Sequence, residues 1–102
     1  MVVTVFRNRL RAEAHDEYRV WIARMRDLAM KMPGYLSHKT FTADDGERVT
    51  IVEFESEATH KSWATHPEHV QAKGLGRERF YSDYRIQVCC VQRESAWSRQ
   101  PD

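Results

Sequence analysis

The hydrophobic side chains of this chain change their period between its first segment and its second. From Val2 to Leu10 apolar and polar residues alternate and β-branched residues are frequent, which is typical of a strand with one buried face. From Ala14 to Met32 the apolar residues recur every three or four positions, which predicts an amphipathic helix of about 18 residues. The chain therefore begins with a strand that is followed by its longest helix.

Two dipeptides that end in glycine mark the boundaries of the next elements. Pro33-Gly34 ends the helix, because proline supplies no backbone N–H and glycine tolerates a left-handed exit. Asp45-Gly46 suits the positive φ angles of a tight hairpin. We therefore expect two strands, at residues 35–41 and 48–55, joined by that hairpin.

The second half of the chain predicts an interrupted helix and a last strand. Ser56 is a natural N-cap for a helix that runs through Trp63. Pro67 is suited to the first turn of a new helical segment, which extends towards residue 79 with two glycines loosening it. An apolar run at residues 80–91 then predicts the final strand.

The order of these elements is β-α-β-β-α-β. This order predicts an α+β fold with a ferredoxin-like protomer, in which a four-stranded antiparallel sheet carries both helices on one face. Several side chains on the opposite face are apolar, so we expect that face to be buried against a second copy in a homodimer. We assign residues 1–93 to one domain and residues 94–102 to a polar C-terminal tail.

Net charge and hydrophobicity argue against nucleic acid and membranes as partners, and the two cysteines are expected to be reduced. Sixteen basic residues against fifteen acidic residues give a net charge of +1, which provides no field to attract nucleic acid or an anionic membrane. The chain has no leader-like apolar run and no stretch of about 20 apolar residues, so a cytoplasmic location without membrane contact is expected. Cys89 and Cys90 are adjacent in a strand, point to opposite faces and are expected to be reduced packing residues.

Aromatic residues are more numerous than a small core needs. The space between the helices and the sheet could hold a flat apolar ligand, or the rings could form an aromatic core alone. Polar side chains on elements that should line this space favour the first alternative, and they are Asn8, His66, His69 and Arg77. His66 and His69 are spaced to share a helix face, but no third ligand stands at metal-site spacing, so we expect no metal.

Short motifs, taken in their order and spacing, resemble the antibiotic biosynthesis monooxygenase domain family. The resemblance runs from residue 2 to about residue 91, and the family is a dimeric α+β barrel of ferredoxin-like protomers. The motifs are Asn8-Arg9-Leu10, Met32-Pro33-Gly34-Tyr35, Asp45-Gly46-Glu47-Arg48-Val49, Trp63-Ala64-Thr65-His66-Pro67-Glu68-His69 and Gly76-Arg77-Glu78-Arg79-Phe80-Tyr81.

The resemblance implies a monooxygenase that oxidises an electron-rich aromatic, of phenol or quinol type, with dioxygen and without a cofactor. It implies a base, a group that stabilises the substrate anion, and a dry pocket. The base would be His66 or His69. The anion would be stabilised by Asn8 and Arg77, and the pocket walls would be Trp63, Tyr81 and Phe54.

Two alternatives stay open at this stage. The heme-degrading branch of the family uses an asparagine on the first strand, a tryptophan on the second helix and an iron-ligating histidine about ten residues later. Asn8 and Trp63 fit that pattern, but Lys73 stands where the histidine is expected, so His69 would have to replace it. The other alternative is a dimeric module that binds a small molecule without catalysis.

Overall fold

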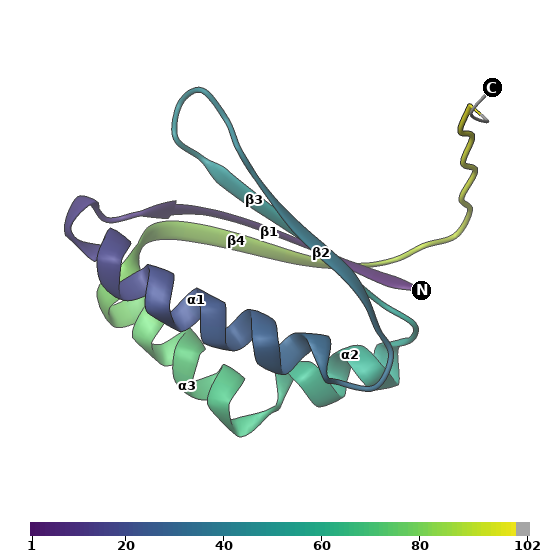
Figure 1. Ribbon diagram of the computed structural model, residues 1–102, viewed down its shortest axis with the longest axis horizontal. Coiled ribbons are helices and arrows are strands. Elements are labelled where there is room, and N and C mark those ends of the chain that lie inside the picture. The colour runs from purple at the N-terminus through teal and green to yellow at the C-terminus, as the bar shows by residue number, and fades with distance from the viewer. Residues whose placement is uncertain (100–102) are drawn as a thin grey trace.

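The structure, a computed structural model, describes residues 1–99, and the end of the predicted tail at residues 100–102 lies outside the described residues. A twisted sheet with strand order β2-β3-β1-β4 lies against a layer of helices, and all three strand pairs are antiparallel (Figure 1). The expected α+β ferredoxin-like fold is confirmed. Within the described part of the chain, no helix is long and apolar enough to cross a bilayer.

The elements follow the predicted order with small differences at their ends. The segment that begins at Pro67 ends as an α-helix at Leu75, one of the outcomes expected from its glycines, and continues as a π-helical turn from Gly76 to Phe80. The elements are β1 (Val2–Leu10), a short 3-10 turn η1 (Ala12–Ala14), α1 (His15–Met30), β2 (Tyr35–Thr42), β3 (Arg48–Phe54), α2 (Glu57–Ala64), α3 (Pro67–Leu75), the π-helical turn η2 (Gly76–Phe80) and β4 (Tyr81–Cys90).

The loop after α1 requires a glycine for two reasons. Gly34 has a φ angle of 82°, a region that side chains with a Cβ rarely adopt. A Cβ at Gly34 would also lie 2.5 Å from the side chain of Thr59 on α2. The carbonyl of Gly34 accepts a hydrogen bond of 2.8 Å from the backbone N–H of Glu55, which holds this loop against the end of β3.

Side chains cap both short helices, and the cap at Ser56 is the one that the sequence predicts. The Ser56 hydroxyl accepts a hydrogen bond from the backbone N–H of Thr59, and the Thr59 hydroxyl accepts one from the backbone N–H of Ser56. Pro67 stands in the first turn of α3, and His66 caps that turn by accepting from the backbone N–H of Glu68. The predicted restart at Pro67 is therefore confirmed.

The core between helices and sheet has two parts. The Trp63 cluster consists of the buried residues Met25, Ala29, Phe54 and Trp63. The Tyr18 cluster consists of the buried residues Ala14, Tyr18 and Phe80. Trp21 of α1 packs against both clusters, so the interior is continuous along the helix layer.

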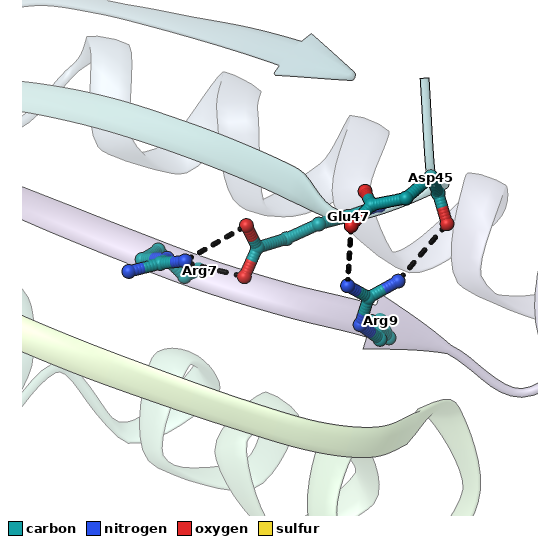
Figure 2. A network of polar contacts seen from close by, with 4 residues as sticks. All are labelled: Arg7, Arg9, Asp45 and Glu47. Atoms are coloured by element: carbon teal, nitrogen blue, oxygen red, sulfur yellow. Dashed lines mark hydrogen bonds and ion pairs between the residues drawn. The ribbon is translucent and has the colours of Figure 1, made fainter. Parts of the chain in front are cut away.

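The face of the sheet that points away from the helices is called the outer face here, and no helix covers it (Figure 1). Figure 2 shows Arg7 and Arg9 of β1 on this face, directed towards Glu47 and Asp45 of the hairpin. Arg7 donates to both carboxylate oxygens of Glu47 at 3.1 and 2.9 Å, and Arg9 pairs with the Asp45 carboxylate at 2.9 Å. These ion pairs fasten the β2–β3 hairpin to the central strand.

The expectation that the two cysteines pack inside the fold was wrong for the single chain. Cys89 and Cys90 are free thiols, as expected, but both are exposed. Both lie at the end of β4, which is an edge strand. Cys89, opposite Val3, is on the outer face, whereas Cys90, opposite Val2, is on the helix side and its Sγ atom donates to the Glu57 carboxylate of α2 at 3.1 Å. The side chains of Ile86 and Val88 on the same strand are also about half exposed, at 49% and 53%.

Candidate active site

Asn8 is the most unusual polar residue of the interior. Its exposure is 1%, and neither the Oδ1 atom nor the Nδ2 atom of its amide has a hydrogen-bond partner in the part of the chain that the structure describes. The strand register places Arg48 of β3 on one side of Asn8 and Tyr84 of β4 on the other. A buried amide without partners is destabilising by about 1–3 kcal/mol, and in native proteins such a group calls for an explanation, of which a catalytic role is one.

Arg48 lies beside this amide with an unpaired atom of its own. Its guanidinium stands over the ring of Tyr18 at 4.8 Å from the centroid, and its Nη1 atom is buried without a partner. Sequence reasoning missed Arg48 and Tyr18 as site residues. Arg48 belongs to the hairpin motif, and no local pattern indicates that it faces Asn8 across the sheet.

Aromatic rings surround these two polar side chains. The Tyr81 ring lies 5.7 Å from that of Tyr18 and 5.5 Å from that of Phe6, in edge-to-face contacts. Burial, reinforced by the neighbouring Tyr18, raises the pKa of Tyr81 well above its usual value, so its hydroxyl keeps its proton. Asn8, Arg48, Tyr18, Tyr81 and Tyr84 are called the Asn8 group below.

Arg77 lies at the exposed rim of the Asn8 group. Its Nη1 atom is 3.5 Å from the hydroxyl of Tyr84, which is a long contact. Gly76, just before it, is buried, and a Cβ there would lie 2.6 Å from the Tyr81 ring. The π-helical turn therefore brings the backbone close to Tyr81 and leaves Arg77 in solvent.

The remaining predicted residues gather around Trp63. The ring of His69 stacks on that of Trp63, with centroids 4.2 Å apart and planes inclined by 10°. The Nδ1 atom of His69 is 3.0 Å from the Trp63 carbonyl, which can only accept, so the neutral ring carries its proton on Nδ1 and keeps a lone pair on Nε2. Burial lowers the pKa of His69 to about 4, so the ring is uncharged at neutral pH.

Two more histidines stand near Trp63 with different hydrogen bonds. His60 pairs its Nε2 atom with the Thr4 hydroxyl of β1 at 3.0 Å, and burial lowers the pKa of His60. His66 uses the Nδ1 lone pair for capping, so in its neutral form the proton is on Nε2. His66 therefore lacks a free lone pair, whereas His69 has one. Thr4, Phe54, His60, Trp63 and His69 are called the His69 group.

The structure thus separates the predicted site residues into two groups. Phe54 pairs with Val2 at one end of β1, and Asn8 lies six residues further along that strand. At about 3.3 Å per residue the two ends are roughly 20 Å apart. Trp21 packs against both clusters of the core, so the two groups belong to one interior.

The residues around Trp63 depart from the heme ligand set at one position. Lys73, at the position where the heme-degrading branch has its iron ligand, donates its ammonium to the carbonyl of Ala64 at 3.0 Å. The substitute, His69, keeps a free Nε2 lone pair, but one face of its ring is covered by Trp63. Among residues 1–99, no three His, Cys, Asp or Glu side chains are grouped so that they could hold a metal ion.

Comparisons with known proteins agree on one family. The family model described as antibiotic biosynthesis monooxygenase matches residues 1–74. The uncharacterized protein YqjZ of Bacillus subtilis (strain 168) is 31% identical over 85 residues, which cover 83% of this chain and 75% of YqjZ.

Solved structures show the same fold at low sequence identity. Rv0793 from Mycobacterium tuberculosis has a TM-score of 0.81 at 18% identity, over 93% of this chain and 98% of that one. SnoaB, a cofactor-independent oxygenase from Streptomyces nogalater, has a TM-score of 0.76 at 16% identity, over 91% of this chain and 94% of that one.

Replacing Asn8 by leucine should stabilise the fold. Asn8→Leu removes two unpaired buried polar atoms and puts a side chain of similar size in their place, so the free energy of unfolding should rise by about 1–3 kcal/mol. The matched control is Thr4→Val on the same face of β1, which removes the partner of His60 and should lower it by about 1 kcal/mol. Urea unfolding measures both. A loss of stability in Asn8→Leu would contradict this account of the amide.

Lowering the pH should destabilise the fold through His69. The pKa of His69 is about 4 in the folded chain against 6.5 for an unperturbed histidine, so below pH 6.5 the unfolded chain binds more protons. The free energy of unfolding should fall between pH 6.5 and 4, with His69 contributing about 2–3 kcal/mol. The substitution His69→Phe should remove this pH-dependent contribution to the free energy of unfolding. The control His15→Gln, at an exposed position, should keep it. Equal pH slopes in His69→Phe and wild type would refute the assignment.

Proposed function

Because the chain belongs to the antibiotic biosynthesis monooxygenase family, and is therefore a monooxygenase among the oxidoreductases, we propose that it oxidises a phenol or quinol with dioxygen. We propose that it does so without a cofactor, which the similarity in fold to the cofactor-independent oxygenase SnoaB supports. The observation that carries the proposal is the buried Asn8 amide, which has no partner and lies beside the unpaired Nη1 atom of Arg48.

Proton removal from the phenol is the first step. His69 is the proposed base, because its Nε2 lone pair is free and burial keeps the ring uncharged at neutral pH. His66 is the weaker candidate, since capping uses its lone pair. Because Asn8 belongs to the other group, its Nδ2 atom donates to the negative charge that spreads to the far end of the conjugated anion or builds up on dioxygen. Arg77 at the rim adds positive charge.

Oxygen chemistry then proceeds from the anion of the substrate. The anion gives one electron to dioxygen, and the resulting superoxide combines with the substrate radical at a ring carbon to form a C–O bond. For a CH₂ carbon conjugated to the phenol, as in an anthrone, the peroxide loses water and leaves a carbonyl. In sum, CH₂ and O₂ become C=O and H₂O, so the substrate supplies all the electrons.

The separation of the two groups constrains the substrate. A molecule that reaches both groups must be elongated, because the His69 group meets β1 at Thr4 and opposite Val2, four to six residues before Asn8. We therefore propose a polycyclic phenol or quinol in preference to a single ring. Its ring faces would lie against Phe54, Trp63 and Tyr81.

A homodimer formed through the outer face completes the proposal. The side chains of Val5 and Ile51 are neighbours at the centre of this face, and no helix of the same chain covers them. Phe41 on the same face is half exposed, at 50%. Apolar residues on an uncovered sheet face favour burial against a second copy. The cytoplasmic location expected from the sequence is part of the same proposal.

Oxygen uptake tests the reaction. With a panel of anthrones and quinols, chelator-treated protein should consume dioxygen faster than the substrate alone. Asn8→Leu should lower kcat by about 10²- to 10³-fold, because the anion loses its hydrogen-bond donor. Gln71→Leu, which removes an exposed amide on α3, should leave the rate unchanged. If no substrate gives uptake above its protein-free rate, a non-enzymatic binding module replaces this proposal.

Light scattering tests the dimer. The wild type should have twice the mass of one chain. Val5→Glu should give the single-chain mass, because a carboxylate at the centre of the outer face, opposite Ile51 and Gln87, has no positive partner across the strands and cannot be buried unpaired. The control is Val70→Glu, since Val70 is 53% exposed on the helix side of the molecule and should not affect the mass. A single-chain mass for the wild type would refute the proposal.

A further inference from the structure

Arg48 has an unsatisfied positive charge next to the proposed site. Its guanidinium is held over the Tyr18 ring, and its Nη1 atom points into the interior without a partner. Within residues 1–99 Arg48 takes part in none of the ion pairs. Those ion pairs involve Arg7, Arg9, Arg11, Arg24 and Arg79. A guanidinium is charged at every physiological pH, so this one lacks the anion that would balance it.

The strand register directs Arg48 and Asn8 at the same small region. The two residues are directly paired across β1 and β3, where the Cα atoms of such a pair are about 5 Å apart and both side chains share a face. The amide offers one acceptor, Oδ1, and two donors on Nδ2, while Nη1 of Arg48 adds a charged donor. A ligand that complements this arrangement carries an O–H donor next to an anionic acceptor.

We propose that Arg48, together with Asn8, selects an aromatic substrate with a carboxylate ortho to the phenolic hydroxyl. The carboxylate accepts from Nη1 of Arg48 and from Nδ2 of Asn8, and the phenolic O–H donates to Oδ1 of Asn8. This inference rests on the proposed function for the identity of the site. Arg48 is a specificity residue in this account, because it holds a substituent that is not oxidised.

A carboxylate matches Arg48 better than a second phenol does. A carboxylic acid is ionised at neutral pH and a phenol is not, so only the acid brings a permanent negative charge to the guanidinium before any proton is removed. The position of Arg48 allows entry from the solvent, because Arg48 is partly exposed and Tyr84 beside the amide is 41% exposed. The rings of Tyr18 and Tyr81 provide flat apolar walls next to this entrance.

Equilibrium binding of small aromatic probes without oxygen tests the inference. The probes are salicylate, which has both groups, benzoate, which lacks the hydroxyl, and phenol, which lacks the charge. The wild type should bind salicylate at least tenfold more tightly than either of the others, as measured by isothermal titration calorimetry. Equal affinities for salicylate and phenol, or no measurable binding of salicylate, would overturn the inference without any variant.

Two substitutions of Arg48 separate charge recognition from a structural role. Arg48→Met should weaken salicylate binding at least tenfold and leave phenol binding within about twofold, while Arg48→Lys should retain most of the preference for salicylate. Arg19→Met, which removes an exposed charge from α1, should bind like the wild type. Equal losses for salicylate and phenol in Arg48→Met would indicate a packing role and overturn the inference.

The outcomes for binding and for catalysis are independent. Binding is measured in the absence of oxygen, so a protein that shows no oxygen uptake but prefers salicylate through Arg48 supports the inference and removes only the proposed reaction. A protein that oxidises neutral quinols but shows no preference for salicylate keeps the proposed reaction and overturns the inference.

Discussion

The pairing of β1 with both of its neighbours determines the rest of this structure. β1 is hydrogen-bonded to β3 on one side and to β4 on the other, so its register fixes which side chains of three strands share a face. A slip of one residue would turn Asn8 to the outer face and Arg7 to the core. The ion pair between Arg7 and Glu47 opposes such a slip, because it joins β1 to the hairpin in one register only.

Stability and function conflict at the Asn8 group. The buried amide and the inward Nη1 atom of Arg48 have no partners among residues 1–99, and each unsatisfied group destabilises the fold. The aromatic contacts around Tyr18 and Tyr81 and the capped helices offset that loss elsewhere. A sequence selected for stability alone would place an apolar side chain at position 8, so the asparagine at this position favours a role in binding or catalysis.

Local sequence patterns were sufficient for the elements and insufficient for the site. The period of the apolar residues, the cap at Ser56 and the proline at position 67 act through near neighbours in the chain, and they predicted the strands, the helices and their order. Asn8 and Arg48 are neighbours through strand pairing between residues 40 positions apart in the chain, so no local pattern reveals that they are adjacent. The exposure of Cys89 depends on the edge position of β4, which the apolar run around it conceals.

The contact between Gly34 and Thr59 has a consequence for how this sequence can diverge. Position 34 is a glycine because the side chain of Thr59 occupies the space where a Cβ would be. Thr59 also forms half of the capping box that begins α2. A larger residue at position 34 would require both a different backbone angle there and a smaller residue at position 59, which would weaken the cap. Among homologues the two positions should therefore change together or not at all, which ties the end of α1 to the start of α2 in the evolution of this chain.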